Sequence, residues 1–223
     1  MRMSRRKLGR MKVEAPDEQT ERKYLLWLPG ERLYHAPEEL PRLTSRSLFG
    51  DDAPLEIEAG CGMGEFLCAQ AENRPGTNFV GVDLHVKSLH RAVSEASERE
   101  LENIVFARAD FNLIYKLLEP ESLRAIYVLF PDPGMKKRQH KNRVFSEKFL
   151  KEARRTLESG GCVFAMTDHE EYFEQMVELS RRAEGWEWGP GEELGGEQMT
   201  RTRFQSLWEG RDRTANALTL VKR

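Results

Sequence analysis

A glycine-rich segment at residues 60–64 (GCGMG) is the first feature of the chain with chemical potential. Because glycine has no Cβ atom, a ligand can approach such a turn closely. Asp83 ends the next predicted strand, and a carboxylate at that point can accept hydrogen bonds from both hydroxyls of a ribose. Glu65 stands where the dinucleotide pattern GxGxxG has its third glycine, which disfavours a nicotinamide cofactor. The combination therefore indicates an adenosine-containing ligand without naming it.

Two further acids lie next to predicted strand ends. Glu58 lies two residues before the glycine segment, where a carboxylate can hold a ligand's ammonium group. Glu56 is expected to be a solvated side chain of the same strand. Asp110 follows the third predicted strand. It can contact the same ligand or cap the next helix, and both interpretations remain open.

An acid between two prolines, followed by a cationic loop, is the most specific feature. Asp132 stands between Pro131 and Pro133, directly after the apolar segment 123–130. Prolines restrict the backbone on both sides and can fix the position of the carboxylate. Residues 136–155 carry nine lysines and arginines against two acids, and such cations can pair with phosphates. A turn followed by a solvated charge run is the alternative, but a nucleic acid bound at the strand ends would explain both features.

Two other segments are less specific candidates. Asp168 with Glu171 resembles a capping box that opens a helix, and this cap can also face a cleft. Residues 200–205 (TRTRFQ) add hydroxyls, cations and an aromatic ring, which suits RNA. The five histidines show no metal-ligand spacing and no Ser–His–Asp arrangement is readable, so we expect no metal site.

Length and composition limit the class of protein. The 223 residues suffice for one large domain with its own core. The 35 Lys and Arg against 37 Asp and Glu disfavour a generally polycationic protein, although residues 1–14 carry six basic groups and one acid. Three cysteines without a CxxC pattern disfavour a disulfide framework and indicate a reducing compartment such as the cytosol. No apolar run approaches the roughly 18 residues of a membrane span.

Predicted strands and helices alternate from residue 54 onward. The alternation predicts βαβ units and a parallel sheet covered on both faces, with ligands bound beyond the carboxyl ends of the strands. Residues 1–50, which four prolines interrupt, are expected to be a basic tail and irregular lead-in, and residues 51–223 the domain. The predicted strands are 55–59, 78–83, 104–107, 123–130, 162–167 and 216–221, and the predicted helices are 65–73, 111–118, 146–157, one through Val86, Leu89, Val93 and Ala96, and one through Tyr172, Met176 and Leu179.

With these segments in order, residues 54–223 resemble the bacterial tRNA (guanine-N(7)-)-methyltransferase family, a branch of the class I S-adenosylmethionine-dependent methyltransferases. The resemblance is carried by IEAGCGMGEFL, FVGVDLH, ARADF, LFPDPGMKKRQHKNR, MTDHEEY and TRFQ. It implies a Rossmann-like α/β fold with a mostly parallel sheet, helices on both faces and a C-terminal antiparallel strand. It also implies a cytoplasmic enzyme that transfers a methyl group from S-adenosyl-L-methionine to N7 of a guanosine in tRNA, usually guanosine 46 of the variable loop.

The resemblance also assigns roles to residues at matching positions. Asp132 is implied to be catalytic and, with Glu58, Gly60, Gly62, Asp83 and Asp110, to bind or frame the cofactor; Lys136, Asp168, Thr202, Arg203, Phe204 and Gln205 would contact guanosine; and Arg138, Gln139, His140, Lys141, Asn142 and Arg143 would meet the tRNA backbone.

Four positions depart from the family pattern. Gly134 stands where Trp is common, Gln139 where His is frequent, Asn142 in place of an Arg, and Gln205 in place of a Glu. The departures leave open a class I methyltransferase paralogue with another RNA or small-molecule substrate, and a non-catalytic RNA-binding module. A nicotinamide-dependent oxidoreductase, which shares the glycine turn and an acid like Asp83, is the alternative from another enzyme class.

Overall fold

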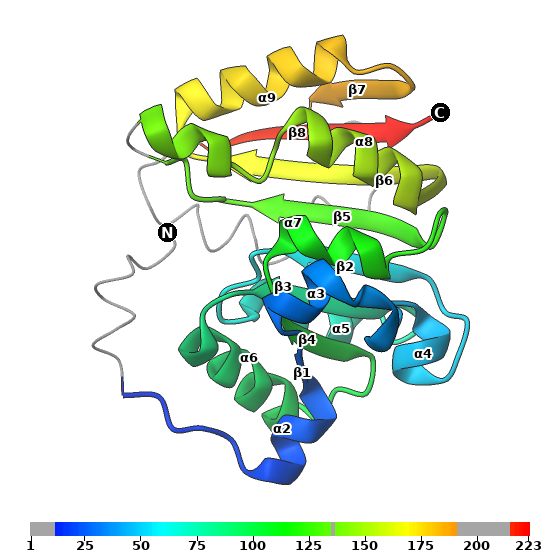
Figure 1. Cartoon of the computed structure of the whole chain (residues 1–223), viewed down its shortest axis with the longest axis vertical. Coiled ribbons are helices and arrows are strands. Elements are labelled where there is room, and N and C mark those ends of the chain that lie inside the picture. Colours follow the sequence, from blue (N-terminus) through cyan, green and yellow to red (C-terminus); the bar gives the residue numbers. More distant parts are fainter. Residues whose placement is uncertain (1–11, 135–136, 191–214) are drawn as a thin grey trace.

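The computed structural model describes residues 12–134, 137–190 and 215–223. The strands are β1 (Leu25–Trp27), β2 (Leu55–Ala59), β3 (Asn78–Asp83), β4 (Ile104–Arg108), β5 (Leu123–Leu129), β6 (Leu157–Thr167), β7 (Trp186–Pro190) and β8 (Asn216–Lys222). They form one eight-stranded sheet in the order β1-β4-β3-β2-β5-β6-β8-β7 (Figure 1). The first six run parallel, and β8 pairs antiparallel with both β6 and β7. The predicted mostly parallel sheet with a C-terminal antiparallel strand is confirmed.

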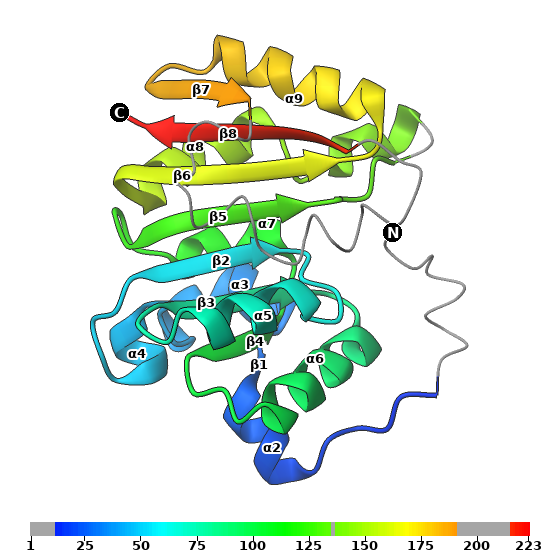
Figure 2. The same ribbon diagram turned by 180° about the vertical axis from the view of Figure 1, so that it is seen from behind.

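Helices cover both faces of this sheet (Figures 1 and 2). The α-helices are α2 (Glu18–Tyr24), α3 (Gly30–His35), α4 (Ser45–Phe49), α5 (Glu65–Asn73), α6 (Val86–Glu98), α7 (Phe111–Ile114), α8 (Glu147–Thr156) and α9 (Glu170–Arg182), and the 3₁₀ helices are η1 (Pro37–Glu39), η2 (Tyr115–Leu117) and η3 (Lys137–Asn142). Helices α3, α7, α8 and α9 lie on one face, and α5 and α6 on the other. Within the described residues no helix is long and apolar enough to cross a membrane.

The two faces of the strands build two apolar layers. Ile57 and Val80 pack into the layer under α3, α7, α8 and α9, whereas Phe79 and Phe106 pack against α5 and α6. All six residues of β3 are buried. A strand that is buried on both faces has mostly apolar residues in a continuous run, and such a run predicts the strand at 78–83.

The glycine pair Gly160-Gly161 lies inside a strand and does not end α8. The chain passes directly from α8 into β6. A Cβ atom on Gly161 would lie 2.9 Å from the Glu158 carbonyl oxygen and 3.0 Å from that of Arg124. The β5–β6 pairing shifts register between Leu123 and Ala125. Glycine therefore permits the close approach of backbones at this irregularity, and β6 starts earlier than predicted.

The described part of the lead-in, residues 12–50, is not irregular. Strand β1 extends the sheet by pairing with β4, so that Leu26 lies beside Ala107. Leu33 and Leu43 are fully buried. Pro29 lies at the N-cap of α3 and Pro37 at the first position of η1. The prolines therefore start short helices, where a missing N–H does no harm, and the prediction of an irregular segment is wrong here.

The expectation that Glu56 is solvated is also wrong, because its side chain is only 2% exposed. Arg74 donates two hydrogen bonds to its carboxylate, at 2.9 and 2.6 Å. Arg124 Nε donates a third at 2.8 Å, and the Tyr127 hydroxyl donates a fourth at 2.8 Å. A charge buried in this way is tolerated only with such partners. The alternation of acids with apolar residues in β2 does not mark a solvated face.

Candidate functional site

The parallel strands end together at what we call the carboxyl edge, defined by the last residues of β2 to β6: Ala59, Asp83, Arg108, Leu129 and Thr167. The register places these ends side by side, because Asp83 pairs with Arg108, and Leu129 with Met166. The arrowheads of β5 and β6 point the same way in Figure 1, opposite to that of β8. The structure therefore brings the predicted glycine turn and the acids at positions 58, 83, 110, 132 and 168 to one edge.

Backbone hydrogen bonds shape the glycine turn. The N–H groups of Gly60 and Cys61 both donate to the Val82 carbonyl, at 2.7 and 3.0 Å. The N–H of Gly62 donates to Asp83 Oδ2 at 3.0 Å. Gly60 and Gly62 have φ angles of 79° and 59°, which favour glycine. The end of β3 thus fixes the turn that follows β2.

Two glycines of this turn serve different purposes. A Cβ atom on Gly64 would lie 2.7 Å from the Ala92 Cβ and 3.0 Å from the Phe106 ring, so this glycine permits the packing of α5 against α6 and β4. A Cβ atom on Gly62 would meet nothing within 4 Å. The backbone at Gly62 therefore faces open space, where a ligand can lie against it.

Asp83 and Glu58 are buried carboxylates at the same place. Asp83 is 6% exposed. One of its oxygens accepts the Gly62 N–H at 3.0 Å, and the other accepts the His85 N–H at 2.9 Å. A carboxylate offers about four lone-pair sites, so these two bonds alone do not saturate it. Glu58 is 4% exposed and pairs with Gly81 and Tyr127 in the neighbouring strands.

Asp110 caps the helix that follows it. It has extended backbone angles, and its Oδ1 accepts the Asn112 N–H at 2.9 Å. The capping interpretation is therefore confirmed for this acid. Asp110 is half-buried at the carboxyl edge, so the cap does not prevent contact with a ligand.

Asp168 is not the cap of its helix, contrary to the prediction. Helix α9 starts one residue later than that prediction requires, and His169 occupies the N-cap with its Nδ1 accepting the Tyr172 N–H at 3.3 Å. A histidine ring can take the place of the usual Asp or Ser because it also carries an acceptor. Asp168 is exposed at the end of β6.

The turn from Phe130 to Gly134, here called the Asp132 turn, has an unusual backbone. Phe130 has a φ of 47°, which costs a non-glycine residue about 1–3 kcal/mol and is typical of functional sites. Asp132 is exposed, and its Oδ1 accepts the Gly134 N–H at 2.9 Å. Gly134 has a φ of 60°, and a Cβ atom there would lie 3.0 Å from the Gln139 Cβ. The positive φ and the close approach of Gln139 therefore favour glycine at position 134.

The cationic loop continues through η3, and the structure separates its predicted tRNA contacts. Arg138, Gln139 and Asn142 are exposed, and His140 is half-buried. Arg143 is 5% exposed, although we predicted it to meet the tRNA backbone. Lys136, the side chain of Lys141, and Thr202, Arg203, Phe204 and Gln205 lie outside the described part of the chain.

Burial excludes a phenolate or thiolate near neutral pH at three described positions. Burial raises the pKa of Tyr172 to about 12; the Phe145 N–H and Arg143 act against this rise, and the negative charge of Asp132 adds to it. Burial likewise raises the pKa of Cys68 to about 12 and of Cys162 to about 11. These groups are therefore protonated and do not act as bases or nucleophiles.

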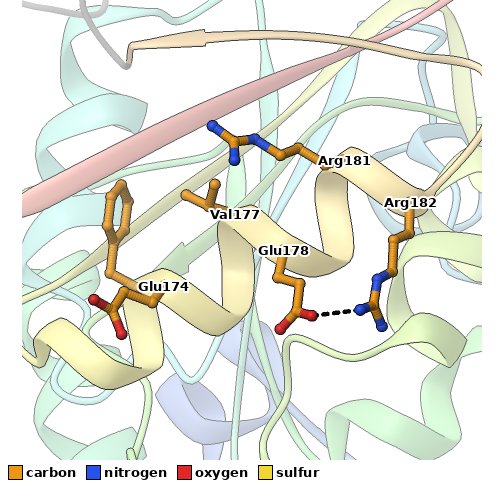
Figure 3. Close-up of a pocket in the computed structure, with 6 residues that line it drawn as sticks. Glu174, Val177, Glu178, Arg181 and Arg182 are labelled. Carbon is orange, nitrogen blue, oxygen red and sulfur yellow. Dashed lines mark hydrogen bonds and ion pairs between the residues drawn. The ribbon is translucent and has the colours of Figure 1, made fainter.

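A pocket lies along α9, lined by residues of that helix alone (Figure 3). Phe173 and Val177 are flanked by charged side chains, including the pair Glu178–Arg182. The lining contains none of the glycines or acids of the carboxyl edge. Among the residues that the structure describes, no group of three or more His, Cys, Asp or Glu side chains is placed to hold a metal ion. The carboxyl edge therefore remains the candidate site.

Known proteins agree with this assignment. A family model described as "Putative methyltransferase" matches residues 52–213. A tRNA (guanine-N(7)-)-methyltransferase of Rubrobacter xylanophilus is 50% identical over 99% of this chain and 100% of its own. Another of that name from Chloroherpeton thalassium is 33% identical over 96% of both chains.

Solved structures are similar in fold. An rRNA methylase from Streptococcus thermophilus matches with a TM-score of 0.53 and 15% identity over 77% of this chain and 88% of its own. The aminoglycoside resistance methyltransferase NpmB1 matches with a TM-score of 0.51 and 21% identity over 76% of this chain and 87% of its own. At this identity the match shows the fold alone, which is that of class I methyltransferases.

Proposed function

The chain belongs to the tRNA (guanine-N(7)-)-methyltransferase family, and we propose that it transfers the methyl group of S-adenosyl-L-methionine to N7 of a guanosine in tRNA. The observation that carries this proposal is the 50% identity to the Rubrobacter xylanophilus protein over 99% of the chain. The expected target is guanosine 46 of the variable loop, and the expected compartment is the cytoplasm. The arrangement of the carboxyl edge supports the proposal for each half of the reaction.

The residues of the glycine turn fit the cofactor. The two Asp83 oxygens can each accept a ribose hydroxyl in addition to the backbone N–H groups they already bind. The open space at Gly62 lets the ligand lie against the main chain there. Glu58 can accept hydrogen bonds from the ammonium group of the ligand. When bound, S-adenosyl-L-methionine supplies a methyl group on a sulfonium sulfur. Asp110, at the next strand end, frames the same pocket.

The chemistry of guanine defines the task of Asp132. N7 is an exposed acceptor with an available lone pair, so it need not lose a proton before it attacks a methyl group. The protein therefore contributes mainly by aligning N7 with the methyl carbon and sulfur. In this proposal the Asp132 carboxylate is an orienting acceptor for guanine N1–H and the exocyclic amine, a pair of donors that adenine lacks. The acids around the cofactor bind its ribose and amine, because a carboxylate at the sulfonium would stabilise the ground state more than the transition state.

The exposed part of the cationic loop would bind the tRNA backbone. Arg138 is exposed on η3, next to the Asp132 turn. Lysines 137 and 141 have the same predicted role from their position in the loop, and Lys136 is predicted to contact guanosine. Guanosine contacts by Asp168 and by residues 202–205 remain predictions from the family resemblance.

A methylation assay on an unmodified tRNA transcript, followed by mapping of the modified nucleotide, tests the proposal. We expect N7-methylguanosine in the variable loop. Methylation of another nucleotide would indicate a paralogue with a different RNA substrate. Binding of tRNA and S-adenosylhomocysteine without turnover would indicate a non-catalytic RNA-binding module. A titration that shows binding of NAD and not of S-adenosylhomocysteine would instead indicate an oxidoreductase.

A further inference from the structure

Arg143 belongs to the interior of the protein, although it ends a cationic loop. Its side chain is 3% exposed. The guanidinium carbon lies 4.5 Å from the centre of the Tyr172 ring, which is itself fully buried. A guanidinium packed on an aromatic ring in this way is well placed for a cation–π contact and poorly placed to reach a phosphate in solvent.

Helix α9 holds this guanidinium on one side. Arg143 Nη1 donates to Gln175 Oε1, and its Nη2 lies 3.6 Å from Glu171 Oε1. Together with Tyr172 these residues occupy one face of α9 at i, i+1 and i+4. The Tyr172 hydroxyl also accepts the Phe145 N–H at 3.1 Å, so the same face fixes the chain that follows the loop.

On its other side, the Arg143 guanidinium binds the Asp132 turn. Arg143 Nε donates to the Pro133 carbonyl at 2.7 Å, and Pro133 is the residue next to Asp132. Arg143 Nη2 also lies 3.1 Å from His140 Nε2, and the Arg143 N–H donates to the His140 carbonyl at 3.0 Å. Since arginine has no acceptor, a hydrogen bond between these two side chains has the guanidinium as its donor.

We propose that Arg143 is a positioning residue, which ties the Asp132 turn to α9 and makes no contact with tRNA. Its effect on catalysis rests on the function proposed above. A planar guanidinium can serve the Pro133 carbonyl, Gln175 and the Tyr172 ring at once, and a lysine ammonium cannot. The bonded carbonyl belongs to the residue directly after Asp132, so a shift of the turn would move the exposed Asp132 carboxylate relative to a bound guanine.

Two substitutions of Arg143 separate positioning from charge. We expect Arg143→Lys and Arg143→Gln both to lower kcat at saturating tRNA by at least about tenfold, since misplacement of about 1 Å can reduce a rate by about 100-fold. The Kd for tRNA, its salt dependence and the Kd for S-adenosylhomocysteine should stay as in the wild type. Full kcat in the lysine variant would overturn the proposal, because charge alone would then suffice. A Gln variant with normal kcat and a salt slope reduced by about one would show a phosphate contact and would also overturn it.

A third variant removes the Arg143–Gln175 hydrogen bond by a change in α9. Gln175→Ala should lower kcat with unchanged tRNA affinity, and its effect should be less than additive with Arg143→Lys, because both remove one interaction. Glu178→Ala, on the solvent side of the same helix in an ion pair with Arg182, is the matched control and should leave kcat unchanged. If the arginine variants fail to fold, normal kcat in Gln175→Ala would still contradict the proposal.

Hydrogen exchange of the Gly134 amide gives a readout that does not require turnover. This N–H donates to Asp132 at 2.9 Å inside the turn. In Arg143→Lys it should exchange about tenfold faster than in the wild type, the factor expected for loss of one charge-assisted hydrogen bond. Unchanged exchange would refute the tie between Arg143 and the turn. Faster exchange in Arg143→Lys, together with a wild-type protein that does not methylate tRNA, would uphold the tie and refute the proposed function.

Discussion

The glycine turn and the Asp132 turn lie at the same edge of the sheet but are held by different means. The glycine turn is fixed by backbone N–H groups that reach Val82 and Asp83 in the adjacent strand. At the Asp132 turn one backbone bond, from the Phe130 N–H to the Met166 carbonyl, reaches the adjacent strand, and side chains hold the rest. Asp132 accepts the Gly134 N–H, and Arg143, which spans to α9, donates to the Pro133 carbonyl. A turn held by the backbone leaves a pattern of glycines in the sequence. A turn held by side chains leaves no such pattern, because an arginine or a glutamine can serve many other purposes in a protein.

The largest expected effect comes from the exposed acid of the second turn. Asp132→Asn should reduce kcat by about 100-fold or more, because the amide can accept only one of the two guanine donors and misaligns N7. The affinity for S-adenosylhomocysteine, measured by calorimetry, should change less than twofold on the same alignment argument. Equal losses of kcat and cofactor affinity would show that Asp132 only frames the pocket.

A substitution at the glycine turn should instead lower cofactor affinity and leave kcat unchanged. Asp83→Asn removes charge-assisted bonds to a ribose and weakens those from Gly62 and His85, so the affinity for S-adenosylhomocysteine should fall by about 10- to 100-fold. With saturating cofactor, kcat should remain near that of the wild type. A variant with normal cofactor affinity would remove Asp83 from the cofactor site and erase the distinction between the two turns.

The cations that follow the Asp132 turn in the sequence should affect RNA alone. Replacement of Lys136, Lys137, Arg138 and Lys141 by alanine together should weaken tRNA binding by about tenfold or more near physiological salt and flatten its salt dependence. The affinity for S-adenosylhomocysteine serves as the internal control and should not change. An unaltered salt slope would exclude this loop from the RNA-binding surface.

The smallest expected effect distinguishes two glycines of one turn. Gly62→Ala and Gly64→Ala both place a Cβ at positive φ, which costs about 1–2 kcal/mol. Gly64→Ala also forces a contact with Ala92, and overpacking adds about 1–3 kcal/mol. Urea denaturation should therefore show Gly64→Ala to be the less stable variant by about 1 kcal/mol or more. Equal free energies of unfolding would mean that α5 and α6 adjust without strain.

Much of the fold could be predicted because local patterns determine it. The predicted bounds of β2, β3 and α5 match the structure, since apolar runs end at glycines or polar residues there. Strand β1 was missed because three residues carry no readable period, and only pairing with β4 makes them a strand. The N-cap of α9 was misplaced by one residue because His169 is an uncommon cap.

The candidate site was predictable where the backbone determines it and not where distant side chains do. Glycines and acids at strand ends predicted which residues meet at the carboxyl edge, and Asp110 proved to be a helix cap. Nothing in the loop distinguishes buried Arg143 from exposed Arg138. The only available signal was the spacing of Glu171, Tyr172 and Gln175 on the following helix, which gains meaning once the loop is seen to pack against it.

Methyl transfer to a tRNA transcript with a single altered atom tests the central claim most directly. Replacement of guanosine 46 by 7-deazaguanosine removes the proposed acceptor N7 and keeps the N1–H and amine donors that Asp132 is proposed to bind. We predict that the wild-type protein methylates the unmodified transcript, binds both transcripts with similar affinity, and transfers no methyl group to the 7-deaza transcript. Equal methylation of the two transcripts would contradict the assignment of N7 at this nucleotide as the acceptor.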